Sequence, residues 1–442
     1  MTRRQKALII AIVWPEPESS AAGWRVLNII DALKDAGYAI TLASPSRENE
    51  FSDRLKNQGI EVQPVAINDS GFDTWVAEAQ FDLAILDRFI IEEQFGWRLH
   101  EYSPSTIRVL DTVDLHFLRR ARQKALSEGK SLSEIFNDQI ELATEDACRE
   151  IASIYRSDLT LILSDHEMDL LKNRFRVDSD LLEPFRFCYR DIPETSGFEE
   201  RANFAVIGNF RHPPNADGTR WLKSELWPLI RKKLKAKGEK AELHVYGAYP
   251  SKDAMNLSNP AEGFIVKGPA SNVHETLKQY RINLAPLRFG AGIKGKISDG
   301  WRAGLPVITT PIGAEGMFLN PSPPVFGGAI THSAEEFSEA AARLYTDAIE
   351  WTHARERGYA VLREYFDYGV NSKRLSESFT ALHQNIKMRR ERNFIGQILH
   401  HQSMRSTKYF SKWIELKEGR SGSLVPALQS QSSNEINETP SS

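Results

Sequence analysis

Short apolar runs alternate with longer amphipathic segments along most of this chain, and the alternation occurs twice. Parallel sheets with crossover helices produce such a pattern. In the first half, residues 20–36 place Trp24, Leu27, Ile30 and Leu33 on one helical face, and Gly37 then ends the helix. The strands expected in this half are Ala7 to Val13, Tyr38 to Ala43, Phe81 to Leu86, Ile107 to Leu110 and Leu159 to Ser164.

The pattern restarts after a polar stretch that contains Pro184 and Pro193 and has no regular periodicity. The second half therefore predicts another doubly wound α/β domain. Its expected strands are Phe204 to Ile207, Glu242 to Tyr246, Gly263 to Val266, Ile282 to Ala285 and Val307 to Thr309. The predicted organisation is a first Rossmann-like domain (1–186), a linker (187–201), a second Rossmann-like domain (202–385), a helical segment packing across both (386–417) and a disordered tail (418–442).

Length and charge restrict the partners of such a chain. A chain of 442 residues exceeds what one hydrophobic core normally holds. With 56 Lys and Arg against 59 Asp and Glu, the net charge of −3 gives no overall positive field, so we expect no nucleic acid partner.

The chain has only two cysteines, Cys148 and Cys188, which predicts a reducing compartment and no Cys-rich zinc site. Because no apolar stretch approaches the roughly 18 to 20 residues that cross a bilayer, we expect a cytoplasmic protein, at most peripheral at the inner face of a membrane.

The loop that follows the expected strand 282–285 concentrates glycines and cations. Glycines let backbone N–H groups approach a bound anion closely, and a following helix adds the partial positive charge of its N-terminus. Two or three cations would complete the neutralisation of a diphosphate. An isolated motif of this kind is more often a turn with surface lysines, but three glycines and three cations in one strand-to-helix loop favour phosphate binding. They are Gly290, Gly292, Gly295, Arg288, Lys294 and Lys296.

The stretch PLRFGAGIKGKISDGWRAGLPVITTPIGAEG (286–316) resembles the donor-site signature of the group 1 retaining nucleotide-sugar glycosyltransferases (family 4). VIGNFRHPPNADGTRWLKSELWP (206–228) and LHVYGAYP (243–250) resemble the opening segments of the second domain of that family. The resemblance implies a GT-B fold, in which two Rossmann-like domains face each other across a cleft. It also implies transfer of a sugar, expected to be a hexose, from a nucleoside-diphosphate sugar to a glycan or other hydroxyl acceptor, with retention and without a metal.

The resemblance assigns roles to individual residues. Arg288 and Lys294 would bind the diphosphate, and Arg211 would assist them as a further cation. Asp299 would accept hydrogen bonds from the ribose, and Glu315 would contact the cleft. Three glycines would let the backbone approach the diphosphate: Gly290, Gly292 and Gly295.

Two positions depart from the family pattern. Ala291 stands where the family commonly has a glutamate that contacts the donor sugar, and residues 212–215 (HPPN) replace a usual arginine and lysine pair. These departures leave two other functions open. One is a scaffold that binds nucleotides or glycans without catalysis, and the other is an epimerase that acts on the nucleotide sugar itself.

The first domain is expected to bind the acceptor. After the strand 107–110 comes TVDLH, where the family often has a histidine that contacts the transferred sugar. By register Asp114 takes that place and His116 lies two residues further on, so both are candidate catalytic residues. A neighbouring carboxylate would orient the ring of such a histidine. Ser164, at the end of another strand, is expected to cap a helix rather than to act chemically.

Two basic segments have simpler interpretations. Residues 231–240 are predicted to be a solvated helix end, because no aromatic residues are interleaved with the lysines. Residues 393–417 mix aromatic, aliphatic and basic residues. Packing across the two domains is the favoured prediction for this segment, and a membrane-surface helix is the alternative.

Overall fold

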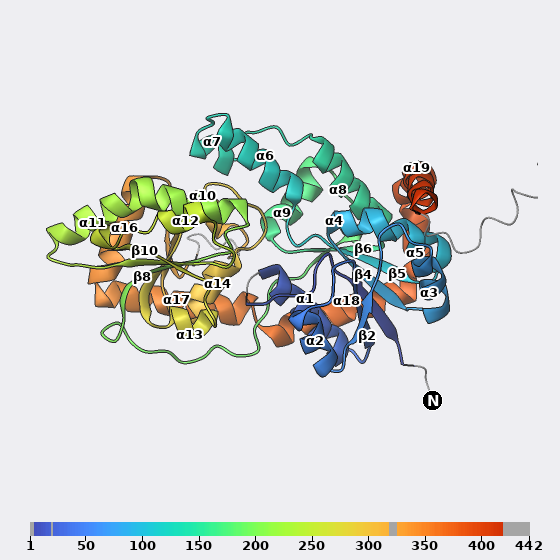
Figure 1. The fold of residues 1–442 in the computed structure, drawn as a ribbon, viewed down its shortest axis with the longest axis horizontal. Helices are drawn as coiled ribbons and strands as arrows, with labels where there is room; N and C mark the ends of the chain where they lie inside the picture. Colours follow the sequence, from blue (N-terminus) through green and yellow to red (C-terminus); the bar gives the residue numbers. More distant parts are fainter. Residues whose placement is uncertain (1–3, 19–20, 318–324, 419–442) are drawn as a thin grey trace, which may run out of the picture.

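The computed structural model describes residues 4–18, 21–317 and 325–418. They form two parallel β-sheets, each with helices on both faces, that lie side by side along the long axis of the molecule (Figure 1). Ser19, Ser20 and the expected tail beyond Glu418 lie outside the described residues.

The first sheet has seven strands in the order β3-β2-β1-β4-β5-β6-β7, and all its pairings are parallel. Its central strands are buried on both faces, which explains why they appear in the sequence as continuous apolar runs. The strands are β1 Lys6–Ile10, β2 Ala39–Ser44, β3 Glu61–Pro64, β4 Leu83–Asp87, β5 Ile107–Asp111, β6 Leu159–Ile162 and β7 Leu182–Pro184.

The second sheet has six parallel strands in the order β10-β9-β8-β11-β12-β13. In both sheets the first strand lies between the second and the fourth, so the order in which successive strands are added to the sheet reverses beside it. Ligands of such sheets bind outside the carboxyl ends of the strands at this switch. The strands are β8 Ala202–Ile207, β9 Leu243–Tyr246, β10 Phe264–Gly268, β11 Tyr280–Ala285, β12 Val307–Thr309 and β13 Gly328–Ile330.

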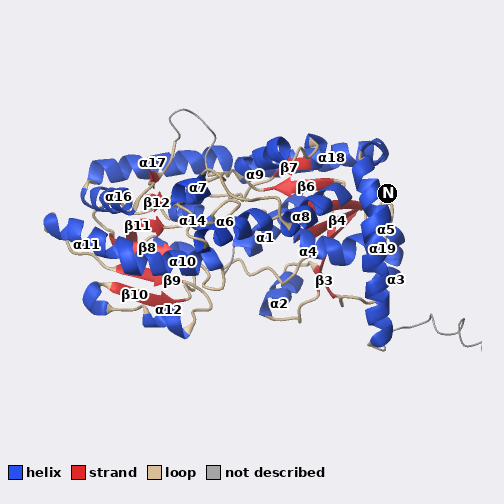
Figure 2. Ribbon diagram, turned by 90° about the horizontal axis from the view of Figure 1, so that it is seen from above, coloured by secondary structure: helices blue, strands red, loops and turns tan. Residues whose placement is uncertain are grey.

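Helices cover both faces of each sheet (Figure 2). In the first domain α1, α2 and α18 pack on one face and α3 and α5 on the other. The helices of this domain are α1 Ala21–Asp35, α2 Glu50–Asn57, α3 Gly71–Ala79, α4 Arg88–Ile91, α5 Trp97–Tyr102, α6 His116–Ser127, α7 Leu132–Phe136, α8 Glu145–Arg156 and α9 Asp165–Asp169. Those of the second are α10 Pro213–Trp221, α11 Trp227–Ala236, α12 Lys252–Asn256, α13 Val273–Leu277, α14 Gly295–Arg302, α15 Pro311–Ala314, α16 Ala334–Thr346 and α17 Ala348–Tyr365.

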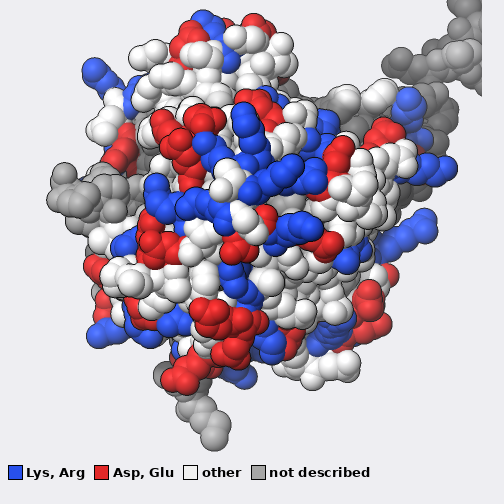
Figure 3. All heavy atoms as spheres, turned by 90° about the vertical axis from the view of Figure 1, so that its left-hand side faces the viewer, with Lys and Arg blue, Asp and Glu red and all other residues white. Residues whose placement is uncertain are grey.

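The basic run 231–240 lies on the end of α11, as expected for a solvated helix end. Lys233 is ion-paired with Glu335 at 2.5 Å and with Glu339 at 3.3 Å, both on α16. Figure 3 shows this end of the second domain, where Asp and Glu side chains lie among the Lys and Arg side chains.

Two long helices, α18 Tyr368–Arg392 and α19 Phe394–Lys417, follow the second domain and return to the first. The inner face of α18 packs against α1, and α19 packs against α8 and α5. The 386–417 segment thus has its main contacts with the first domain. Among the described residues, none of the helices combines the length and the apolar character needed to cross a membrane.

Helix α19 is held on α5 by two stacked histidines. The rings of His100 and His400 lie 4.0 Å apart between centroids and are nearly parallel. Burial and the nearby guanidinium of Arg108 lower the pKa of His100 to about 4 and that of His400 to about 3. The other charged groups that influence these rings are Arg390, Asp158, Glu101 and Arg156.

Acid is expected to release α19. Both folded pKa values lie below the ordinary 6.5, so the stability that the neutral pair contributes is complete above pH 6.5 and is lost as the pH falls toward 4. Hydrogen exchange of the α19 amides, corrected for the intrinsic rate, should be faster at pH 5 than at pH 7. His400→Gln should weaken this difference. Equal protection of the native helix at both pH values would contradict the prediction.

Candidate functional site

The glycine-rich loop connects β11 to α14 at the switch point of the second sheet and lies against the first domain. Gly292 has a φ of +63°, and a Cβ atom there would lie 2.9 Å from the Cβ of Asp114. Its backbone N–H donates to Glu167 Oε1 at 2.9 Å. At Gly295 a Cβ would lie 2.8 Å from that of Ala21. Glycine is therefore required at both positions because the two domains approach each other closely there. The sequence analysis had explained these glycines only by the approach of the backbone to a diphosphate.

Lys294 is the N-cap residue of α14, and its side chain is buried under the loop. Its Nζ donates to the carbonyl of Gly292 at 2.6 Å and lies 3.6 Å from Oε2 of Glu315. Burial lowers the pKa of Lys294, and the Glu315 carboxylate opposes that shift. The loop thus holds a fixed cation among its own backbone groups.

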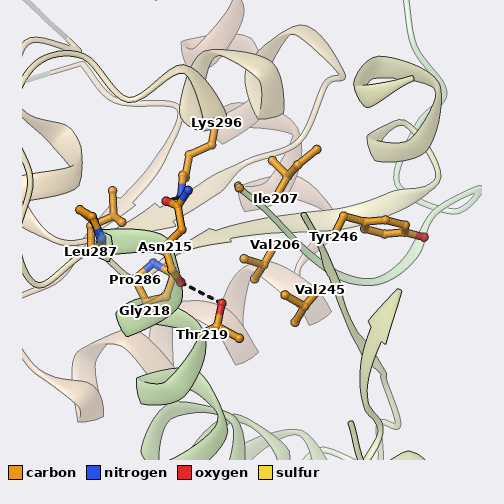
Figure 4. Close-up of a pocket in the computed structure, with 12 residues that line it drawn as sticks. Val206, Ile207, Asn215, Gly218, Thr219, Val245, Tyr246, Pro286, Leu287 and Lys296 are labelled. Carbon is orange, nitrogen blue, oxygen red and sulfur yellow. Dashed lines mark hydrogen bonds between the residues drawn. The ribbon is translucent and has the colours of Figure 1, made fainter. Parts of the chain in front are cut away.

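A small cavity lies beside the loop, at the carboxyl ends of β8 and β9 (Figure 4). Lys296 reaches into it from α14 and donates to Asn215 Oδ1 of α10. Gly208 forms part of the wall, and a Cβ at that position would lie 3.0 Å from Lys296 Nζ. Burial lowers the pKa of Lys296 to about 7, so its charge is poorly compensated.

Asp299 lies one turn further along α14 than Gly295. Burial raises the pKa of its carboxyl to about 7, against the influence of Arg302 and Lys296. Within the described residues this carboxylate makes no hydrogen bond. Lys296 and Asp299 are therefore two partly buried, incompletely paired ionisable groups at the switch point, and such groups are typical of ligand sites.

The two predicted arginines already have partners. Arg288 forms a bidentate ion pair with Asp217 of α10, at 2.6 and 2.9 Å. Arg211 lies 3.8 Å from the ring centroid of Tyr249, whose hydroxyl donates to Glu16 of the first domain at 3.1 Å. Arg288 is thus held by Asp217 and Arg211 is stacked on Tyr249, and the roles of both arginines in binding a diphosphate stay predictions.

The first domain contributes the loop between β5 and α6, which faces Gly292. His116 Nε2 lies 3.3 Å from Asp114 Oδ1, so a carboxylate does orient the ring. Burial would raise the pKa of Asp114, but Arg119, at 2.6 Å, and His116 outweigh it and keep the pKa well below its usual range. The ring of His116 packs edge-on against Phe89. Asp114 thus lies beside the glycine-rich loop with His116 next to it, and the catalytic roles of both residues stay predictions.

Arg122 of α6 connects the two domains, and the sequence did not predict this. Its buried guanidinium donates to both carboxylate oxygens of Glu315 at 2.7 Å and to the carbonyl of Gly290 at 2.8 Å. It also contacts Asp138 at 2.9 Å and His166 Nε2 at 3.2 Å. The carboxylate expected to face the cleft, Glu315, is therefore held by Arg122 and Lys294.

Ser164 caps α9 by accepting the N–H of Glu167, as the sequence predicted. Among the described residues, no three His, Cys, Asp or Glu side chains are grouped so that they could hold a metal ion.

Residues 201–347 match the family model described as glycosyl transferases group 1. This segment contains the glycine-rich loop, Lys296, Asp299 and Glu315, and it covers about a third of the chain. The match confirms the expected enzyme class, a glycosyltransferase. None of the curated protein sequences matches the chain.

Solved structures resemble nearly the whole described fold. HepE from Anabaena, in complex with UDP and glucose, superposes with a TM-score of 0.62 and 12% identity, over 86% of this chain and 100% of that one. The pneumococcal O-GlcNAc transferase GtfA, in complex with UDP and GlcNAc, gives a TM-score of 0.62 and 10% identity over 86% and 99%. A mutant of TarM from S. aureus gives 0.62 and 8% over 85% and 99%. These likenesses confirm the predicted GT-B fold of two Rossmann-like domains.

Proposed function

We propose that this chain is a retaining glycosyltransferase of family 4 type that moves a sugar from a nucleoside-diphosphate sugar to a hydroxyl of a glycan, without a metal ion. The observation that carries the proposal is the pair Lys296 and Asp299, incompletely paired at the switch point of the group 1 domain. A diphosphate would supply the anion that Lys296 lacks, and ribose hydroxyls would supply the donors that Asp299 lacks.

The surrounding groups suit the leaving group of this reaction. When the bond between the anomeric carbon and the phosphate oxygen breaks, the oxygen keeps the electron pair and positive charge develops on the sugar ring. Lys294, Lys296 and the N-terminus of α14 would stabilise the departing diphosphate. The acceptor oxygen then bonds to the anomeric carbon, and its proton passes to the departing phosphate. His116 and Asp114, across from Gly292, would contact the transferring sugar.

The nucleotide of the donor is proposed from the similar solved structures. Two of the similar structures, HepE and GtfA, are complexes with UDP and a sugar, and that of TarM includes UDP. UDP is therefore the first nucleotide to test, with GDP and ADP beside it.

Binding of UDP at pH 8 is expected to take up about one proton. The free Lys296 side chain, with a pKa of about 7, is mostly neutral at pH 8, and a bound diphosphate would raise that pKa. Calorimetry of the same titration in two buffers of different ionisation enthalpy measures the uptake. Lys296→Met should abolish the uptake and weaken binding, whereas Lys252→Met, on the exposed start of α12, should change neither.

Assays of the native protein with nucleotide sugars distinguish a transferase from the two alternative functions, a scaffold and an epimerase. Slow hydrolysis of a nucleotide sugar would release free nucleotide from a transferase, whereas a scaffold would release none. An epimerase would convert the nucleotide sugar without any acceptor. Failure of UDP, GDP and ADP to bind the native protein would overturn the proposal.

A further inference from the structure

Helix α19 is oriented with its apolar side outward. Seven large apolar side chains are exposed among those of α19 that the structure describes, and the 3.6-residue period of an α-helix places them within about 160° of its circumference. The seven are Phe394, Ile395, Ile398, Tyr409, Phe410, Trp413 and Leu416.

The docked side of α19 is small or polar. Gly396 lies so close to α8 that a Cβ there would be 2.2 Å from the carbonyl oxygen of Tyr155. Ser411 accepts a hydrogen bond from Arg98 at 2.9 Å, and Glu415 accepts the backbone N–H of Ser70 at 2.9 Å. These contacts fix the orientation, so the helix cannot turn its apolar side inward without breaking them. An outward stripe of this size on a fixed helix indicates an apolar environment outside the protein.

The charges along α19 suit an anionic surface. The only acidic residue between 394 and 417 is Glu415, which is buried at 5% exposure. Lys417 lies over the Trp413 ring, and Lys412, near the edge of the apolar side, donates to the hydroxyl of Tyr102 at 3.1 Å. Aromatic and aliphatic side chains flanked by lysines are the composition of helices that lie in the interface of a membrane. The exposed apolar side chains form two groups, at 394–398 and 409–416, on one side of a helix of 24 residues that is about 36 Å long, so both groups can contact one flat surface.

We propose that the exposed side of α19 binds the surface of an anionic phospholipid bilayer, with the helix lying in the plane of the interface. In Figures 1 and 2 the helix lies at the end of the first domain that is remote from the second. The donor loop would therefore remain accessible to nucleotides while the protein is bound. The inference is independent of the proposed reaction.

Vesicle sedimentation of the full chain tests this surface. We expect binding to vesicles of phosphatidylcholine and phosphatidylglycerol (7:3), weaker binding to phosphatidylcholine alone, and a further loss at high salt. The triple variant Tyr409→Ser, Phe410→Ser, Trp413→Ser should reduce binding more than about tenfold. A control with Ile349→Ser and Val370→Ser removes two exposed apolar side chains from α17 and α18 and should bind as the native chain does.

Two further readouts make the test decisive. The emission of Trp413 should shift to shorter wavelength on binding, and Trp413→Phe should bind without that shift. Nucleotide affinity should be equal in the native chain and the triple variant, which separates this surface from the donor site. Absence of binding to anionic vesicles, or equal binding by the triple variant, would overturn the proposal. So would a stable dimer that the triple variant dissociates, since the stripe would then be an interface between two copies.

Discussion

Replacing Lys294 by alanine is expected to lower kcat for sugar transfer by about two to three orders of magnitude, because removal of one preorganised charge donor typically costs about 3 to 4 kcal/mol of barrier. The structure holds Lys294 Nζ between the carbonyl of Gly292 and the carboxylate of Glu315, so the charge is in place before the phosphate departs. The substitution also removes a contact that fixes the glycine-rich loop. Affinity for UDP should therefore fall together with kcat.

Calorimetric titration with UDP and steady-state rates with a UDP-sugar measure the two effects separately. Lys278→Ala is a matched control, because Lys278 is an exposed lysine of the same domain whose partner is the surface residue Glu275. Lys294→Arg keeps the charge and should restore part of the affinity. If Lys294→Ala left the nucleoside-diphosphate affinity unchanged, the assignment of the donor site would be wrong.

The second large effect is expected at Arg122. Arg122→Met keeps most of the volume but removes the guanidinium that pairs with Glu315 and Asp138, which leaves Glu315 only the longer contact with Lys294. Breaking a buried ion pair from one side typically costs about 3 to 5 kcal/mol of unfolding free energy. Burial would raise the pKa of Glu315, and at present Arg122 and Lys294 keep that pKa below its usual range. The variant should therefore also bind a proton at Glu315 more readily.

Urea unfolding of Arg122→Met at pH 7 measures this loss. Arg120→Met, two residues earlier on α6, removes a largely exposed pair with Asp146 and should cost no more than about 1 kcal/mol. The double variant Arg122→Met, Glu315→Gln should recover part of the loss, because the incompletely paired carboxylate is gone. Equal stability of the two single methionine variants would show that the Arg122 contacts contribute little.

The interior strands and the edge strand β10 could be predicted from sequence, whereas three other edge strands could not. Strands such as β1 and β11 are buried on both faces and so appear as apolar runs. The strands β3, β7 and β13 lie at sheet edges, have three or four residues and are partly exposed, so their sequences have no distinctive pattern.

The periodicity of the charged segment from about Leu118 to Arg156 predicts one long helical stretch, and the structure has three helices there, α6, α7 and α8. The signals for the breaks were present in the sequence. Gly129 adopts a φ of +81° after α6, and Ser131 and Glu134 form a capping box at the start of α7. Local capping chemistry therefore outweighed the helical periodicity on which the prediction relied.

The glycine-rich loop could be identified as a candidate site because its glycines and cations are contiguous in sequence. The contacts of Arg122 could not, because its partners lie at positions 138, 166, 290 and 315, which only the two-domain fold brings together. No local motif distinguishes Arg122 from the other arginines of α6. Contacts between two domains join residues that are distant in sequence, so no single segment contains a signal that predicts them.

Glu167 is a common hydrogen-bond acceptor for the two loops that are predicted to bind the donor and the acceptor. Its Oε1 accepts the N–H of Leu115, at the start of the helix that carries His116, and the N–H of Gly292 in the donor loop. A ligand that displaces either loop alters the hydrogen bond that this oxygen accepts from the other loop, and so changes the conformational free energy of that other loop. By thermodynamic linkage, whatever a bound nucleotide does to acceptor affinity through this oxygen, a bound acceptor does to nucleotide affinity by the same factor.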